Sequence, residues 1–299
     1  MMARMPELSR RAILRLGVGA AAGAAGAYAL GSVLHTPTTA APSVSMTSAG
    51  APLAPPPPLE PAPAAVQPTY VDGSFVSAAR GGVATNWAIA RPPGQTAALR
   101  PVIALHGKGQ DAAGVMAGGV ENGLAQAVAA GIPPFAVVAV DGGGSYWHKR
   151  ASGEDSGAMV LNELIPMLAS QGLDTSRVGF LGWSMGGYGA LLLGGALGPR
   201  RTAAICAVAP ALFTDYGLAL QEGAFDGPAD WFAYSVYGTP ALSEIPLRID
   251  CGAGDRFYDA TKQFVASLRR PPSGVSFIGG HDVAAWREKL PRELAWLAT

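Results

Sequence analysis

Charged residues are scarce in this sequence, and neither sign predominates. Only 14% of the 299 residues are Asp, Glu, Lys or Arg, and 21 basic side chains balance 21 acidic ones. A chain without net charge lacks the electrostatic attraction to phosphates on which nucleic-acid binding largely depends. We therefore expect no nucleic-acid partner.

Cysteine and histidine are also rare, with two and four residues respectively. Two cysteines cannot form a disulfide scaffold in a chain of this length, and no Cys-x-x-Cys or His-x-x-x-His spacing indicates a zinc site. We expect neither a metal nor an organic cofactor. Hydrophobic residues, by contrast, make up 49% of the chain, enough to fill a sizeable core.

The N-terminal region has a charge gradient. Arginines, among them the pair Arg10-Arg11, precede a stretch from Leu16 to Leu59 that contains no charged residue. A basic segment followed by the apolar run Leu16–Leu34 is typical of an export signal, and the arginine pair resembles a twin-arginine signal. The alternative is an uncleaved membrane anchor, because the run is just long enough to span a bilayer. Either way, residues 1–40 predict an extracytoplasmic protein, in the cell envelope or secreted.

Residues 41–68 are rich in proline and alanine, which predicts an extended linker without a core of its own. The remaining residues, 69–299, have the length of one α/β domain. We therefore divide the chain into a signal or anchor, a linker and one folded domain.

Within the folded domain, short apolar runs alternate with longer helical segments, which predicts a doubly wound, mostly parallel sheet with helices on both faces. Two further runs, 70–79 and 83–89, predict an antiparallel edge. The expected parallel strands are Val102–Leu105, Phe135–Val140, Val178–Leu181, Ala204–Val208 and Leu247–Cys251, and the expected helices are 115–130, 156–170, 185–197, 258–269 and 283–297. Functional residues should lie on the loops after the carboxyl ends of these strands.

One such loop carries a nucleophile motif. Residues 182–186 read Gly-Trp-Ser-Met-Gly, which matches G-x-S-x-G, with an apolar strand before it and an Ala/Leu-rich helix after it. In this motif the serine occupies a strained turn in which larger side chains two positions away would collide. Ser184 is therefore the candidate nucleophile.

A serine hydroxyl needs a base, and in this strand–turn–helix context the order along the chain is Ser, acid, His. The other three histidines precede Ser184, so His281 is the only available base. Asp255 follows the strand 247–251 and is the preferred acid, with Asp250 inside that strand as the alternative and Asp282 a weaker choice. The backbone N–H groups of Met185 and of a residue near Lys108 are the expected oxyanion donors.

Taken together, these segments resemble the putative esterase family of α/β-hydrolases, which includes esterase D type thioesterases, feruloyl esterases and the antigen 85 mycolyltransferases. The segments that carry the resemblance are Leu105-His106-Gly107, residues 182–191, Asp250-Cys251-Gly252 with Asp255-Arg256-Phe257, and Gly280-His281-Asp282 with Trp286 and Leu290-Pro291. The resemblance implies an α/β-hydrolase fold and the triad of Ser184, Asp255 and His281. It also implies a carboxylic ester hydrolase that works through an acyl-enzyme intermediate on a small-molecule or lipid ester.

Aromatic residues near the motifs predict a substrate cleft. Trp147 lies on the loop after strand 135–140, and Trp231 lies in the long aromatic segment 211–237. With His106 and Trp183, they are our candidate substrate-binding residues.

Other functions remain open at this point. An acyltransferase of the mycolyltransferase type and a non-catalytic cell-envelope binding protein would share the fold. Gly107-x-Gly109-x-x-Ala112 with Asp141 also resembles a dinucleotide-binding pattern. That last interpretation leaves Ser184 and His281 without roles.

Overall fold

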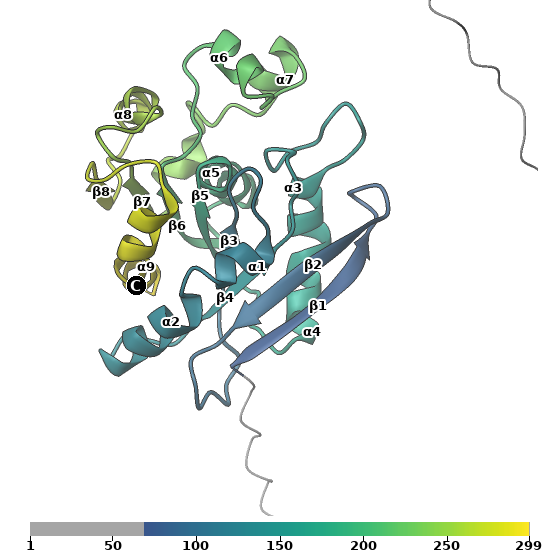
Figure 1. Ribbon diagram of the computed structural model, residues 1–299, viewed down its shortest axis with the longest axis vertical. Coiled ribbons are helices and arrows are strands. Elements are labelled where there is room, and N and C mark those ends of the chain that lie inside the picture. The colour runs from purple at the N-terminus through teal and green to yellow at the C-terminus, as the bar shows by residue number, and fades with distance from the viewer. Residues whose placement is uncertain (1–68, 299) are drawn as a thin grey trace, which may run out of the picture. The chain divides into compact units, whose positions relative to one another are not determined.

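A computed structural model describes residues 69–298, which form a central eight-stranded sheet in the order β1-β2-β4-β3-β5-β6-β7-β8 (Figure 1). The strands are β1 (Tyr70–Ser77), β2 (Val83–Ala90), β3 (Pro101–Leu105), β4 (Ala136–Val140), β5 (Val178–Trp183), β6 (Thr202–Val208), β7 (Leu247–Asp250) and β8 (Gly274–Ser276). β1 and β2 form an antiparallel hairpin that pairs antiparallel with β4, and β3 to β8 run parallel. The predicted mostly parallel sheet with an antiparallel edge is confirmed.

Every residue of β3, β4 and β5 is buried. Parallel strands covered on both faces read as continuous apolar runs, which is why the sequence locates these strands to within two residues. β8 is shorter than its neighbours and only partly buried, and correspondingly it is the least evident strand in the sequence.

Helices cover both faces of the sheet (Figure 1). One apolar cluster joins one face to α1, α2 and α9, and a second joins the other face to the segment 156–170, α5 and α8. The helices are α1 (Ala112–Met116), α2 (Val120–Ala129), α3 (Ser156–Ala158), the π-helix η1 (Met159–Leu164), α4 (Ile165–Ser170), α5 (Met185–Leu197), α6 (Tyr216–Gln221), α7 (Pro228–Ala233), the 3₁₀ helix η2 (Pro240–Ser243), α8 (Tyr258–Ser267) and α9 (Val283–Leu297).

Two predicted helices are interrupted. The helix expected over 115–130 is wrong as a single element: it is divided into α1 and α2 at Gly119, whose φ of 101° is a left-handed conformation that suits glycine. The helix expected over 156–170 contains the π-helical turn η1, and Pro166 follows it at the start of α4. Proline has no N–H, so the regular hydrogen bond to the carbonyl of residue 162 is absent there.

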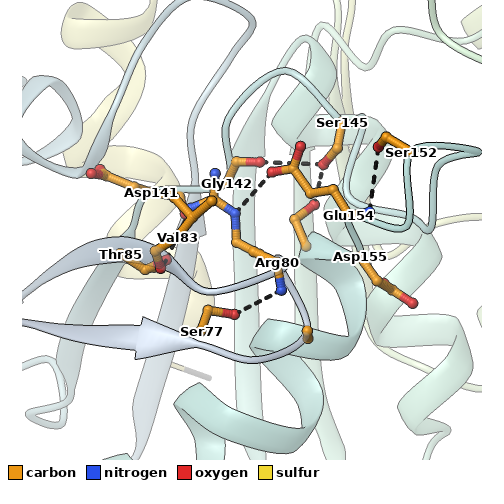
Figure 2. Close-up of polar contacts among 12 residues, drawn as sticks. Ser77, Arg80, Val83, Thr85, Asp141, Gly142, Ser145, Ser152, Glu154 and Asp155 are labelled. Carbon is orange, nitrogen blue, oxygen red and sulfur yellow. Dashed lines mark hydrogen bonds and ion pairs between the residues drawn. The ribbon is translucent and has the colours of Figure 1, made fainter. Parts of the chain in front are cut away.

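A buried arginine fastens the β1–β2 hairpin to the loop after β4 (Figure 2). Arg80 donates to Thr85 Oγ1 at 3.0 Å and to the carbonyl of Asp141 at 2.8 Å, and it pairs with Glu154 at 3.0 Å. Its side chain is 7% exposed, and these partners compensate the charge that burial would otherwise leave unpaired. Through Arg80, the antiparallel edge supports the loop after β4, which lies at the carboxyl ends of the parallel strands.

Cys206 of β6 and Cys251, directly after β7, are free and buried. Burial raises the pKa of the Cys206 thiol and brings that of Cys251 to about 11. Neither thiol is therefore a ready nucleophile.

The predicted signal or anchor (1–40) and the linker (41–68) lie outside the described residues. Within residues 69–298, none of the helices has the length and apolar character needed to cross a bilayer.

Candidate active site

The elbow at the end of β5 places Ser184 in a strained turn directly before α5. Ser184 has φ 53° and ψ −116°, a conformation that non-glycine residues rarely adopt. A Cβ on Gly182 would lie 2.1 Å from the carbonyl oxygen of Gly186, and one on Gly186 would lie 1.9 Å from that of Leu105. Both glycines of the motif are therefore required by the backbone around the serine.

Asp255 and His281 are brought together from the loops after β7 and β8. His281 Nδ1 lies 2.7 Å from Asp255 Oδ2, and Asp255 Oδ1 accepts the N–H of Phe257 at 2.8 Å. The Asp255 side chain is fully enclosed, whereas His281 is 26% exposed. The carboxylate is thus held on both oxygens and fixes the orientation of the imidazole.

The alternative acids have other partners. Asp250 lies within β7, where its Oδ2 accepts two hydrogen bonds from Arg248, at 2.9 and 3.0 Å. Asp282 caps α9 by accepting the N–H of Ala285 at 2.9 Å. The carboxylate bound to His281 is that of Asp255.

Gly107 and Trp286 form a series of neighbours between Ser184 and His281. A Cβ built on Gly107 would lie 3.7 Å from Ser184 Cβ and 3.8 Å from the outer edge of the Trp286 ring. The Trp286 ring in turn lies 5.8 Å, centroid to centroid, from the His281 imidazole. Glycine at position 107 leaves open the space where these three elements meet.

His106 orients the loop after β3. The N–H of Gly142 donates to His106 Nε2 at 2.9 Å, so Nδ1 carries the proton and donates to the carbonyl of Gly107 at 2.8 Å. Burial lowers the pKa of His106, which favours this neutral form. Because a trans peptide places C=O and N–H on opposite sides, holding the Gly107 carbonyl directs the N–H of Lys108 away from it.

Met185 is the first residue of α5. The first N–H groups of a helix have no partner within it, and they carry the positive end of the helix dipole. The N–H of Met185, next to Ser184, is thus suited to hold an oxyanion.

The four predicted substrate-binding residues are separated. Trp183 and His106 line a pocket of about 50 Å³ between α1 and α9. Trp231 of α7 lines a smaller pocket together with Phe213 and Tyr237. The prediction for Trp147 is corrected: its side chain is fully buried, and it packs against Gly142 and Gly189. Its large aromatic surface fills the core rather than a cleft.

The sequence did not predict a set of contacts between the segment after α6 and the loops that follow β3 and β7. Lys108 Nζ donates to the main-chain carbonyl of Glu222 at 2.6 Å, and the Glu222 carboxylate pairs with Arg256 at 2.5 Å. Glu222 follows α6, so it ties this helix to the loops after β3 and β7. Nothing in the sequence distinguishes this glutamate from an ordinary surface residue.

Comparison of the sequence with protein-family models and with characterised proteins finds no match. Solved structures do match. FphF, a fluorophosphonate-binding serine hydrolase of Staphylococcus aureus, is similar with a TM-score of 0.66 and 20% identity, over 77% of this chain and 98% of its own. An S-formylglutathione hydrolase from Agrobacterium tumefaciens has a TM-score of 0.62 at 20% identity, over 77% and 94% of the chains.

A ferulic acid esterase is similar with a TM-score of 0.65 and 18% identity, over 77% of this chain and 97% of its own. These likenesses establish the architecture. The chain has the α/β-hydrolase fold, as the sequence predicted.

Proposed function

We infer that this protein is a serine esterase that hydrolyses carboxylic esters through an acyl-enzyme intermediate. The observation that carries the proposal is the 2.7 Å contact between His281 and Asp255, on a fold whose elbow presents Ser184. The similar structures support it, because their names describe serine hydrolases and esterases. A fold by itself does not determine function, so the proposal depends on the geometry of this site.

In the proposed reaction, His281 Nε2 takes the proton of Ser184 as Oγ attacks the ester carbonyl. The N–H groups of Met185 and Lys108 stabilise the tetrahedral oxyanion, and Asp255 stabilises the imidazolium. His281 then gives the proton to the leaving alcohol, and an acyl group remains on Ser184. Water, deprotonated by His281, releases the acid and restores the serine.

Hydrolysis of p-nitrophenyl esters, from acetate to palmitate, tests the proposal. We expect the wild-type chain to cleave at least one ester and Ser184→Ala to lower kcat by about 10⁴-fold or more, since the alcohol nucleophile is absent. Both proteins should unfold at the same urea concentration. Hydrolysis that survives in the folded Ser184→Ala variant would contradict the assignment.

The same assay distinguishes the acids. Asp255→Asn should lower kcat strongly, whereas Asp250→Asn should affect chiefly stability. The opposite result, with both variants folded, would transfer the acid role to Asp250.

The proposed location is outside the cytoplasm, with residues 1–40 as an export signal or anchor. The arginine pair before the apolar run supports this part of the proposal.

A further inference from the structure

The pocket between α1 and α9 lies directly beside the proposed nucleophile. Its walls include Gly107, on which an added Cβ would lie 3.7 Å from Ser184 Cβ, and Trp183, which precedes that serine in the chain. Trp286 of α9 completes this side, with its ring 6.1 Å from that of Trp183. A part of the substrate bound in this pocket would therefore be the part next to the ester bond that reacts with Ser184.

The buried lining of the pocket is apolar except for the neutral imidazole of His106. Val115 and Leu290 are buried in its lining together with Trp183, and none of them carries a charge. The exposed residues Gln110 and Arg287 lie at its mouth. Such a site favours an uncharged hydrocarbon group, because a charged group would lose its hydration without gaining a partner.

The position of His281 indicates which part of an ester enters the pocket. His281 must protonate the oxygen of the leaving alcohol, so the alcohol departs on the histidine side of the serine. The pocket shares that side, since Trp286 contacts His281 and Val283 of the wall is only two residues away. We assign the acyl part of the ester to the other side, where the aromatic segment 211–237 lines a small pocket of its own.

The size of the pocket limits the group. An apolar protein cavity of about 150 Å³ holds benzene. The volume here is about 50 Å³, roughly a third of that, which corresponds to about two carbons of a chain.

From these observations we propose that the pocket binds the alcohol part of the ester and selects short, uncharged aliphatic alcohols. This inference rests on the proposed esterase function and adds the substrate class. Trp286 and Val115, on opposite walls, set the permitted length of the alcohol.

The test uses two isomeric esters that place the same chain on opposite sides of the reacting bond. Hexyl acetate carries six carbons on the alcohol, and ethyl hexanoate carries them on the acid. Each is compared with ethyl acetate, and kcat/KM is measured by titration of the acid released. The proteins are the full chain and its Trp286→Ala and Val115→Phe variants.

Trp286→Ala should enlarge the pocket and raise the ratio of hexyl acetate to ethyl acetate by about tenfold, while the ratio for ethyl hexanoate stays unchanged. Val115→Phe should narrow it and lower the ratio of ethyl acetate to methyl acetate by about tenfold, because the two-carbon alcohol no longer fits. Trp231→Ala is the matched control, because it removes the same side chain from the other pocket and should leave the alcohol ratios unchanged.

Three results would overturn the proposal: alcohol ratios that do not move in either variant, a shift confined to ethyl hexanoate, or an equal shift for both isomers. Failure of the proposed function is a different result. In that case the wild-type chain would hydrolyse none of the esters, and the role of the pocket would be refuted together with the function.

Discussion

At the scale of single residues, His106 has a structural task that its position in the motif does not reveal. It accepts from Gly142 and donates to Gly107, and so joins the loops after β4 and β3. Through the Gly107–Lys108 peptide it sets the direction of the Lys108 N–H. His106 therefore positions the proposed oxyanion donor, and it also lines the pocket beside Ser184.

We predict that His106→Ala lowers kcat by about tenfold to a hundredfold and changes KM little, because a displaced donor weakens chiefly the transition state. The variant should also lose about 1–3 kcal/mol of stability, because the N–H of Gly142 is left buried without its partner. His148→Ala is a suitable control, since His148 is equally buried but contacts the carbonyls of Lys149 and Ala224. Equal changes in kcat and KM would contradict the positioning role.

At the scale of secondary-structure elements, the contact between α9 and β7 contains buried carboxyl groups. Glu293 of α9 is fully buried, and burial, followed by the nearby charge of Asp250, raises its pKa to about 8. Arg248 and Lys289 oppose this shift, and the neutral thiol of Cys206 lies on the same face. Glu293 is thus protonated in the folded chain at neutral pH.

This pKa makes stability depend on pH in a defined direction. The folded chain holds the proton more tightly than the unfolded chain, whose Glu has a pKa of 4.5. The contribution of Glu293 is therefore most favourable below pH 4.5, falls as the pH rises to about 8, and is constant above that.

Glu293→Gln keeps the shape and removes the proton equilibrium. We predict that it raises the free energy of unfolding by about 2–4 kcal/mol at pH 8.5, and by much less at pH 5. Urea denaturation at the two pH values measures this. A gain of equal size at both would show that Glu293 is ionised in the folded protein.

Another feature at this scale is the segment after α6. Its residues 222–226 are held by basic side chains from the loops after β3, β4 and β7. Lys108 and Arg256 bind Glu222, and Arg150 pairs with Asp226 at 2.7 Å, which lowers the pKa of Asp226 to about 2. These contacts fix the segment across the rim that bears the site.

At the scale of the whole molecule, the parallel sheet explains what the sequence could predict. Strands buried on both faces leave uninterrupted apolar runs, and the parallel arrangement brings their following loops to one rim. The elbow around Ser184 is recognisable because its glycines are sterically required, and His281 follows from the order of residues along the chain. These signals are local or depend on order alone.

The features that sequence reasoning missed depend on packing between distant segments. The sequence predicts Trp147 in a substrate cleft, yet the glycines at 142 and 189 leave room for it in the core. The sequence prefers Asp255 over Asp250 because Asp255 lies on the loop after the strand, but only the fold shows that Asp250 is paired with Arg248. Likewise, Glu222 meets Lys108 and Arg256 only after the loops are placed.

Covalent labelling with a fluorophosphonate, followed by mass spectrometry of the peptide that contains Ser184, addresses the proposed nucleophile directly and does not require the substrate to be identified. An activated serine should form a stable phosphonate adduct, and the reaction should slow strongly in His281→Ala because the base is absent. We predict one adduct per chain, on Ser184. A wild-type chain that remains unlabelled, or an adduct on another residue with Ser184 unmodified, would contradict the serine esterase proposal.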